Sequence, residues 1–139
     1  MLDLEHHPEA VVVRLRATTL DSALLDGLAA AITYIGPDRP IVLTGDGGVF
    51  APDLAPMSRL EDVLNALRAH PRPVIAAING DAIGAGYALA EAADIRIMAG
   101  GNGARAAVAA GLVDLHCSPA HLITLALRLA THTPLRAAG

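Results

Sequence analysis

The chain has 139 residues, a formal net charge of −4 and a hydrophobic content of 53%, with aromatic residues at only 2%. This length and composition exclude a disordered chain and predict one domain over residues 1–139, with a core of Ala, Val, Leu and Ile. The acidic charge excludes the basic face that is typical of nucleic-acid-binding proteins.

The composition also indicates a compartment. A single cysteine, Cys117, excludes an internal disulfide framework, which is typical of proteins in a reducing cytoplasm. The first ten residues lack the basic and apolar regions of a signal peptide. No apolar run approaches the roughly 18 residues of a membrane span. We therefore expect a soluble cytoplasmic protein with no membrane contact.

Strand and helix patterns alternate along the chain. In order, they predict a strand over 10–15, a helix over 21–35, a strand over 40–44, a helix over 58–70, a strand over 74–78, a Gly/Asp turn over 79–86 that opens a helix through 92, a strand over 94–99, a weak helical turn over 104–110 and a helix over 119–130. Asp21 is the expected N-cap of the first helix. The continuous apolar strands predict a sheet covered on both faces by helices, and we expect His6 and His7 to lie in a frayed N-terminus.

Two segments have an ordered pattern of motifs. Residues 41–54 (IVLTGDGGVFAPDL) contain an apolar strand, a Gly-rich turn and a loop that ends in Asp-Leu. Residues 73–100 (PVIAAINGDAIGAGYALAEAADIRIMAG) contain, in order, Pro before a strand, Asn-Gly, a Gly-x-Gly helix opening and Ala-Asp-Ile before the next strand. With residues 15–32, these segments resemble the enoyl-CoA hydratase/isomerase (crotonase) family over most of residues 10–115. The resemblance implies an α/β crotonase-like (ClpP/crotonase) spiral of β-β-α units with the C-terminal helical region truncated.

The resemblance also implies a chemistry. Crotonase-family proteins bind an acyl-CoA thioester, so a coenzyme A thioester is expected as substrate or ligand, with no covalently bound cofactor. Two backbone N–H groups polarise the thioester oxygen and stabilise the enolate-like anion, which is the dominant catalytic contribution in many enzymes. One or two acidic side chains then move protons or activate water.

The two backbone donors map onto identifiable positions. The donor at the helix start corresponds to Ala85, whose N–H remains available. The other belongs to the residue before the loop aspartate, which here is Asp53, and the preceding residue is Pro52. Proline has no N–H to donate, so the amide of Asp53 or Leu54 is expected to replace it.

The family's two catalytic glutamates have no counterpart in this sequence. The first position, on the helix after Gly-x-Gly, corresponds to Ala88, and the second falls near Ala107. Alanine cannot transfer a proton, so ordinary hydratase activity is not expected.

Three other acids are candidate substitutes. Asp114 matches the region from which isomerase and dehalogenase relatives project a working aspartate, and His116 is nearby as a partner. Glu91 lies one turn beyond Ala88, and Asp81 lies in the turn before the helix. Structural roles compete: Asp81 as a turn former, Glu91 as a solvated helix residue and Asp114 as an N-terminal helper to the last helix.

Cationic and metal-binding residues give weaker signals. Arg16 and Arg59 are the candidates for contacting the phosphates of CoA, although exposed arginines are commonly just solvated. His116, Cys117 and His121 are close in sequence, but adjacent side chains diverge and no further ligands complete a set, so no metal site is expected.

Three functional hypotheses stay open. The chain is an acyl-CoA enzyme such as an isomerase, a non-catalytic acyl-CoA-binding module (a pseudoenzyme), or a structural or regulatory subunit. In the last case it forms a hetero-oligomer with a full-length crotonase homologue. A core of small side chains leaves apolar surface to be covered, so we also expect self-association as a trimer or larger homo-oligomer.

Overall fold

The computed structural model describes residues 2–16, 20–47, 49–51, 60–82, 85–100 and 102–133. The strands are β1 (Leu2–His6), β2 (Val11–Leu15), β3 (Ile41–Thr44), β4 (Val49–Ala51), β5 (Val74–Ile78), β6 (Asp81–Ala82), β7 (Ile95–Ala99) and β8 (Leu115–Cys117). The helices are α1 (Ser22–Ile35), α2 (Glu61–Ala69), α3 (Ala85–Glu91), α4 (Asn102–Ala109), the short 3₁₀ helix η1 (Pro119–His121) and α5 (Leu122–His132).

Six strands form one sheet in the order β1-β2-β3-β5-β7-β8, and β4 pairs with β6 in a separate sheet. Within the large sheet β1 is antiparallel to β2, and the remaining neighbours are parallel. The order of elements repeats β-β-α three times, as β1-β2-α1, β3-β4-α2 and β5-β6-α3. This repeat confirms the predicted architecture.

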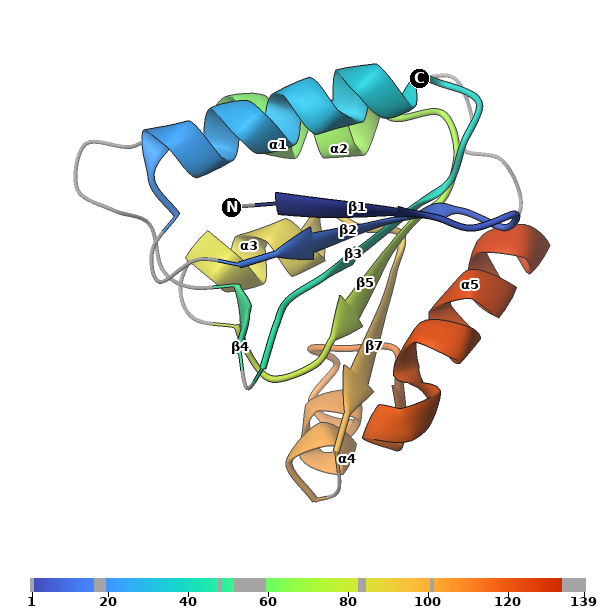
Figure 1. The fold of residues 1–139 in the computed structure, drawn as a ribbon. Coiled ribbons are helices and arrows are strands. Elements are labelled where there is room, and N and C mark those ends of the chain that lie inside the picture. Colours follow the sequence, from blue (N-terminus) through green and yellow to red (C-terminus); the bar gives the residue numbers. More distant parts are fainter. Residues whose placement is uncertain are drawn as a thin grey trace.

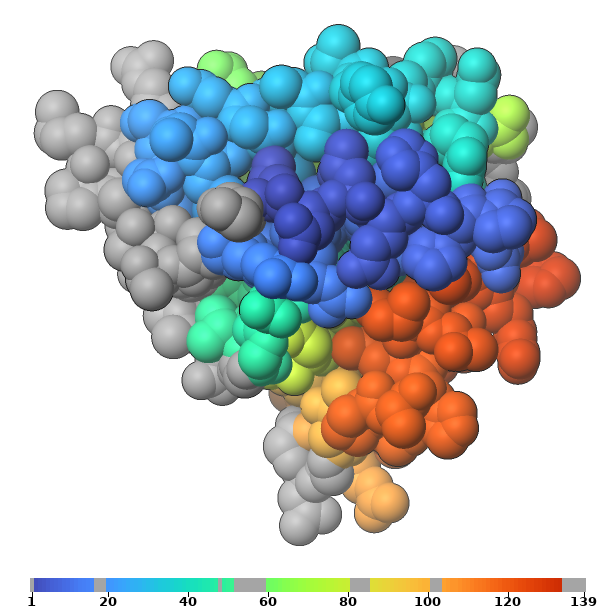
Figure 2. All heavy atoms as spheres, viewed as in Figure 1, coloured from blue at the N-terminus to red at the C-terminus, as the bar shows by residue number. Residues whose placement is uncertain are grey.

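Helices cover both faces of the large sheet, as the apolar strands predicted (Figure 1). The side chains of β5 alternate between the two faces: Val74, Ala76 and Ile78 pack with α1, α2 and α3. Ile75 and Ala77 pack with α5 on the other face. The space-filling view shows α5 adjoining the β1–β2 hairpin (Figure 2), where Ala10 and Val12 join the same apolar cluster as α5. No helix within the described ranges is long and apolar enough to cross a membrane.

The ends of α1 follow the expected capping chemistry. Asp21 is the N-cap, and its Oδ1 accepts a hydrogen bond from the Leu24 N–H at 2.8 Å. Gly36, with φ of 79°, ends the helix and donates its N–H to the Ile32 carbonyl. Glycine adopts this left-handed conformation without the steric cost of a Cβ.

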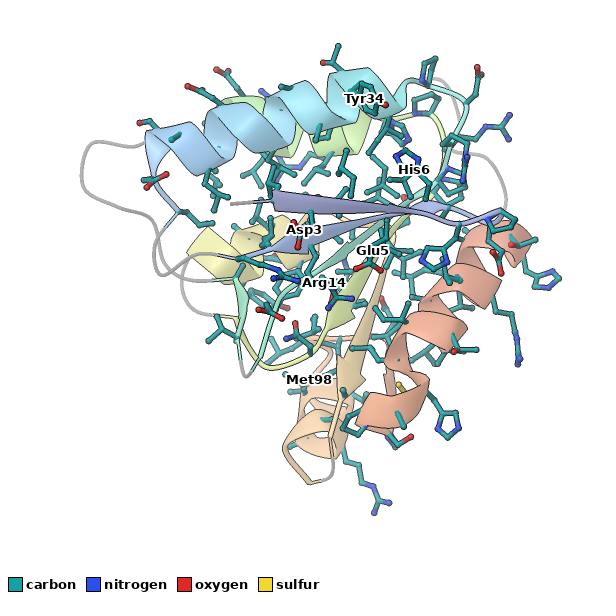
Figure 3. The ribbon with its side chains drawn as sticks, viewed as in Figure 1. Asp3, Glu5, His6, Arg14, Tyr34 and Met98 are labelled. Carbon is teal, nitrogen blue, oxygen red and sulfur yellow. The ribbon has the colours of Figure 1, made fainter. Side chains whose placement is uncertain are left out.

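The N-terminal segment corrects a prediction. His6 is not frayed: it ends β1 and lies opposite Val11 of β2. The segment alternates apolar and charged residues, with Leu2 and Leu4 packed against the core below α1. Asp3 and Glu5 lie on the opposite side of β1, near Arg14 of β2 (Figure 3). Such cross-strand pairing stabilises an edge strand.

The C-terminal third differs in detail from the prediction. Residues expected to form only a weak helical turn form α4, and β8 was not predicted at all. The final helix begins as η1 at Pro119 and continues as α5. β8 is only three residues long, too short for a strand pattern to be recognised, and parallel pairing with β7 stabilises it.

Candidate functional site

The candidate site lies where β3 and β5 end. β3 continues through a tight turn into β4, and β5 continues into β6, which leads towards α3. β4 and β6 pair in parallel, with Val49 opposite Asp81 and Ala51 opposite Ala82. This pairing joins the strand that precedes residue 52 to the strand that precedes α3, which begins at Ala85.

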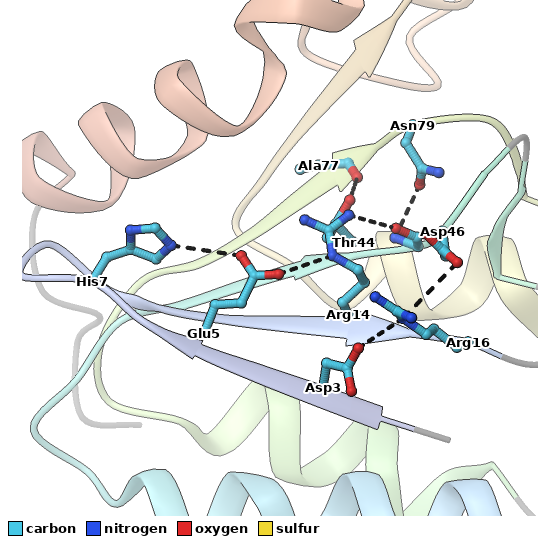
Figure 4. Close-up of polar contacts among 10 residues, drawn as sticks. Asp3, Glu5, His7, Arg14, Arg16, Thr44, Asp46, Ala77 and Asn79 are labelled. Atoms are coloured by element: carbon cyan, nitrogen blue, oxygen red, sulfur yellow. Dashed lines mark hydrogen bonds and ion pairs between the residues drawn. The ribbon is translucent and has the colours of Figure 1, made fainter.

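Hydrogen bonds that involve side chains hold the end of β3 and the turn between β3 and β4 to the neighbouring strands. The Thr44 hydroxyl donates to the Ala77 carbonyl at 2.8 Å, which joins the ends of β3 and β5. Asn79, which follows β5, accepts a hydrogen bond from the Gly45 N–H at 2.9 Å. Arg14 of β2 donates to the Gly45 carbonyl at 3.1 Å. Figure 4 shows this set of contacts at the ends of the three strands.

The predicted donor positions are partly outside the described residues. Ala85 is the first residue of α3, so its amide belongs to the first turn of the helix, where N–H groups have no intrahelical partner. Pro52 and Asp53 lie outside the described residues, and so does Arg59, the second predicted CoA contact.

The two positions that lack glutamates lie in apolar surroundings. Ala88 on α3 and Ala107 on α4 are partly buried and pack against the core cluster below α1 and α2. The Ala107 carbonyl accepts the Leu112 N–H at 2.9 Å at the end of α4. Neither position supplies a group that can transfer a proton.

Asp114 lies just before β8 and is bonded to Arg96 of β7. Its Oδ2 accepts the Arg96 backbone N–H at 2.9 Å and lies 3.2 Å from Nη2 of the same arginine. The Asp114 N–H donates to the Arg96 carbonyl at 3.0 Å. The carboxylate therefore joins β7 to the segment before β8.

Arg96 also places Asp114 relative to α3. Its Nη1 donates to the Ala90 and Glu91 carbonyls in the last turn of that helix, at 3.3 and 3.2 Å, and to the Ala93 carbonyl just beyond the helix, at 2.9 Å. Asp114 is therefore near the C-terminal end of α3, whereas Ala85 begins it. Whether Asp114 acts together with the Ala85 amide stays a prediction.

Tyr87 is a functional candidate that the sequence patterns did not single out. Its hydroxyl donates to the Leu112 carbonyl at 2.6 Å and so links α3 to the turn after α4. Burial raises the pKa of Tyr87, and the negative charges of Glu91 and Asp114 raise it further. The hydroxyl is therefore protonated at neutral pH and acts as a donor. A lone aromatic residue in an alanine-rich helix was the one available signal.

The remaining acids differ in position. Glu91 is exposed at the C-terminal end of α3, in the surroundings expected of a solvated helix residue. The backbone of Asp81 belongs to β6 and pairs with Val49.

Arg16, the first predicted CoA contact, already has acidic partners. Its Nε lies 2.7 Å from Oδ2 of Asp3 and 3.9 Å from Oδ2 of Asp46. Half of the side chain is exposed, so the guanidinium is accessible from solvent but partly neutralised.

The histidines and the cysteine near the C-terminus do not form a ligand set. Ser118 Oγ and His121 Nδ1 lie 2.6 Å apart, whereas His116 and Cys117 lie in β8. Burial raises the pKa of the Cys117 thiol. Among the residues that the structure describes, no three His, Cys, Asp or Glu side chains are placed to share a metal ion.

The β-β-α repeat, the β4–β6 pair and α3 define a crotonase-like α/β protein. Residues 11–114 match the family described as Enoyl-CoA hydratase/isomerase. The chain therefore belongs to the enoyl-CoA hydratase/isomerase family.

Two mycobacterial relatives illustrate the match. The chain is 41% identical over 95 residues to "Probable enoyl-CoA hydratase echA6" of Mycobacterium tuberculosis, a match that covers 60% of this chain and 39% of the relative. It is 33% identical over 126 residues to "Probable enoyl-CoA hydratase EchA12" of the same species, covering 69% of this chain and 44% of the relative. The chain thus spans less than half the length of these curated relatives.

Solved structures agree with the fold. A probable enoyl-CoA hydratase/isomerase from Mycobacterium abscessus superposes with a TM-score of 0.80 at 26% identity, covering 94% of this chain and 73% of that chain. A monofunctional enoyl CoA isomerase from M. smegmatis gives a TM-score of 0.83 at 24% identity, covering 94% and 83% of the two chains. The second similarity concerns the fold alone.

Proposed function

We propose that the chain binds an acyl-CoA thioester and does not hydrate it. The observation that supports binding is the parallel pairing of β4 with β6, the strands that precede residue 52 and the start of α3 at Ala85 in the sequence. In the family, backbone N–H groups of the segments that follow these strands bind the thioester oxygen. The Ala85 N–H lies in the first turn of α3, and a donor that a helix already holds in place loses little free energy to reorganisation when the ligand binds.

The absence of hydration follows from the missing carboxylates. Addition of water to an enoyl thioester requires a group that activates water and a group that protonates the α-carbon. The family's two positions for these groups correspond to Ala88 and to a position near Ala107, and both alanines are packed in apolar surroundings. Without these groups, the two proton transfers that hydration requires have no general acid or base at the family's positions.

The test is a calorimetric titration of the folded protein with crotonyl-CoA, with free CoA as the control ligand. We expect crotonyl-CoA to bind more tightly than CoA, because the thioester oxygen adds contacts to the backbone donors. The same sample should give no loss of the enoyl absorbance over the uncatalysed rate. Equal affinity for the two ligands rejects the proposal, and measurable hydration rejects its second half.

A single-carboxylate isomerase reaction through Asp114 is the alternative activity. It predicts that Asp114→Asn abolishes double-bond isomerisation and leaves crotonyl-CoA affinity unchanged. The contacts with Arg96 favour a structural role instead, in which Asp114→Asn lowers stability. Assaying isomerisation and urea unfolding on the same variant separates these two roles.

A second candidate function is that of a non-catalytic subunit which partners a full-length crotonase homologue or further copies of itself. The observation in its favour is the exposed edge of the large sheet at β8. Leu115 on this strand is 41% exposed, and Leu112 just before it is 50% exposed. An exposed edge strand with large apolar side chains is a pairing surface.

Sedimentation velocity tests this second function. The chain would be run alone over a range of concentrations, and then mixed with purified M. tuberculosis echA6. Association that Leu115→Glu abolishes supports a subunit role through β8. A monomer at every concentration, with no complex in the mixture, rejects it.

A further inference from the structure

We propose that Asn79 is a positioning residue that sets the geometry of the thioester site through the turn between β3 and β4. The inference rests on the proposed function and adds to it a side chain that contacts no ligand. Asn79 immediately follows β5, so its main chain leads into β6 while its side chain reaches the turn that leads into β4.

The Asn79 amide bonds to both limbs of that turn. Its Oδ1 accepts the Gly45 N–H at 2.9 Å. Its Nδ2 donates to the Gly47 carbonyl at 2.9 Å and to the Val49 carbonyl at 3.2 Å. Both N–H donors of the asparagine amide and one lone pair of its oxygen are thus used. Aspartate, with no donor when ionised, cannot reproduce this arrangement.

A second side chain restrains the same turn from the opposite side. Arg14 donates from Nη1 to the Gly45 carbonyl at 3.1 Å, and its Nε donates to Glu5 at 3.1 Å (Figure 4). Both the N–H and the carbonyl of Gly45 are thus bonded to side chains of neighbouring strands. A chain of contacts runs from the edge strand β1 through Arg14 and Gly45 to Asn79.

The turn is also too tight to shift freely. A Cβ at Gly45 would lie 2.1 Å from the Val49 carbonyl oxygen and 2.3 Å from the Phe50 carbonyl oxygen. The backbone of β4 therefore passes directly over Gly45. Releasing the Asn79 contacts frees the Gly47 and Val49 carbonyls and allows β4 to move relative to β6.

Movement of β4 changes its distance from β6, the strand that precedes α3. Val49 and Ala51 pair with residues 81 and 82, which immediately precede the segment leading to α3. The Asn79 side chain thus bonds to the turn before β4, while the Asn79 main chain leads into β6. Misplacement of binding groups by about 1 Å is enough to weaken their action strongly.

The experiment compares Asn79→Ala with wild type and with Asn65→Ala, a matched control on the exposed side of α2. Affinities for crotonyl-CoA and for free CoA are measured by calorimetry. We expect Asn79→Ala to reduce the ratio of crotonyl-CoA affinity to CoA affinity about tenfold, with little change in the CoA affinity itself. A tenfold change corresponds to the net contribution of about one or two hydrogen bonds. The control should leave both affinities unchanged.

Amide hydrogen exchange, followed by NMR, gives a second readout that needs no ligand. The Gly45 N–H should exchange about tenfold faster in Asn79→Ala, because its acceptor is lost, whereas the Leu43 N–H within β3 should stay protected. If Asn79→Ala does not fold, Asn79→Asp is used. It keeps an acceptor for the Gly45 N–H and loses both donors, so it should lower the thioester preference without the large change at Gly45.

The outcomes are distinguishable. An unchanged preference for crotonyl-CoA in a folded Asn79 variant overturns the inference and leaves the proposed function intact. Equal loss of CoA and crotonyl-CoA affinity also overturns it, because general destabilisation explains that result. If wild type itself shows no preference, the proposed function fails, and Gly45 exchange alone then decides whether Asn79 positions the turn.

Discussion

Arg96 is the residue at which three elements of the fold meet. It belongs to β7, donates to the last carbonyls of α3 and pairs with Asp114 before β8. The final carbonyls of a helix have no intrahelical partner, and a cation there also interacts favourably with the helix dipole. The Arg96 side chain is 21% exposed, so solvent screens these contacts only partly.

The first prediction concerns the pair Arg96 and Asp114. Arg96→Ala should lower the free energy of unfolding by about 1–3 kcal/mol, because it removes charged hydrogen bonds to both the helix end and Asp114. Asp114→Asn should cost less. A double-mutant cycle in urea should then give a coupling energy of about 0.5–1 kcal/mol. Strict additivity would mean that the pair contributes nothing to stability.

The second prediction concerns Glu5. The hydrogen bond from Arg14 lowers the pKa of Glu5 below its ordinary value of 4.5, against a smaller opposing effect of burial. A lowered pKa in the folded state stabilises the fold above the unfolded-state pKa, and this contribution is lost as the pH falls through the folded value. Glu5→Gln should therefore reduce stability at pH 7 and flatten its decline below pH 4.5. Parallel acid-unfolding curves for wild type and variant would contradict this assignment.

At the scale of elements, the turn between β3 and β4 has no room for a side chain at position 45. A Cβ added at Gly36, Gly47, Gly100 or Gly111 would meet open space, whereas Gly45 lies directly beneath the backbone of β4. The same turn leads into β4, one of the two paired strands of the candidate site. Its sequence is therefore constrained by packing as well as by any ligand.

The third prediction compares two glycine substitutions. Gly45→Ala should lower the free energy of unfolding by about 3 kcal/mol or more, because the new Cβ would overlap the Val49 and Phe50 carbonyls. Gly27→Ala in α1 is the matched control: its Cβ would meet only Leu2 Cδ1 at 3.4 Å. Since alanine favours helix, this control should be neutral or stabilising by up to about 1 kcal/mol. Similar costs in urea unfolding would show that the close approach at Gly45 is not restrictive.

At the scale of the whole molecule, two apolar clusters lie on opposite faces of one sheet. The same strands contribute to both clusters. β5, for example, contributes Ile78 to one cluster and Ile75 to the other, and both side chains are essentially inaccessible to solvent. Loss of packing on one face removes the support of the strands on which the other face depends. We therefore propose that the described core behaves as one cooperative unit.

The fourth prediction follows from that sharing. Ile75→Ala and Ile78→Ala should each lower the free energy of unfolding by about 2–5 kcal/mol. In each variant, far-UV circular dichroism and tyrosine fluorescence should give the same midpoint, as a two-state transition requires. Leu112→Ala, at a half-exposed position, should change stability by less than about 0.5 kcal/mol. Midpoints that separate in one variant would show that the two faces unfold independently.

The elements that local physics controls were predictable. The apolar run over 74–78 coincides with β5, and the cap at Asp21 and the stop at Gly36 delimit α1. The ordered motifs of residues 41–54 and 73–100 predicted the family and the β-β-α architecture. That Ala88 and a position near Ala107 correspond to the family's two catalytic glutamates stays a prediction, because it depends on the resemblance alone.

The remaining features depend on segments that lie far apart in the sequence. The short strands β4, β6 and β8 become strands through their partners, and β1 was mistaken for a frayed end because its alternating pattern gains meaning only beside β2. Asp114 was an isolated acid until β7 placed Arg96 beside it, and Asn79 was a turn residue until β3 placed Gly45 beside it. The sequence by itself determined the family and the main elements, since these follow from local pattern and residue identity. Which polar groups meet was decided by the tertiary structure, because hydrogen bonds and ion pairs depend on distances that folding alone creates.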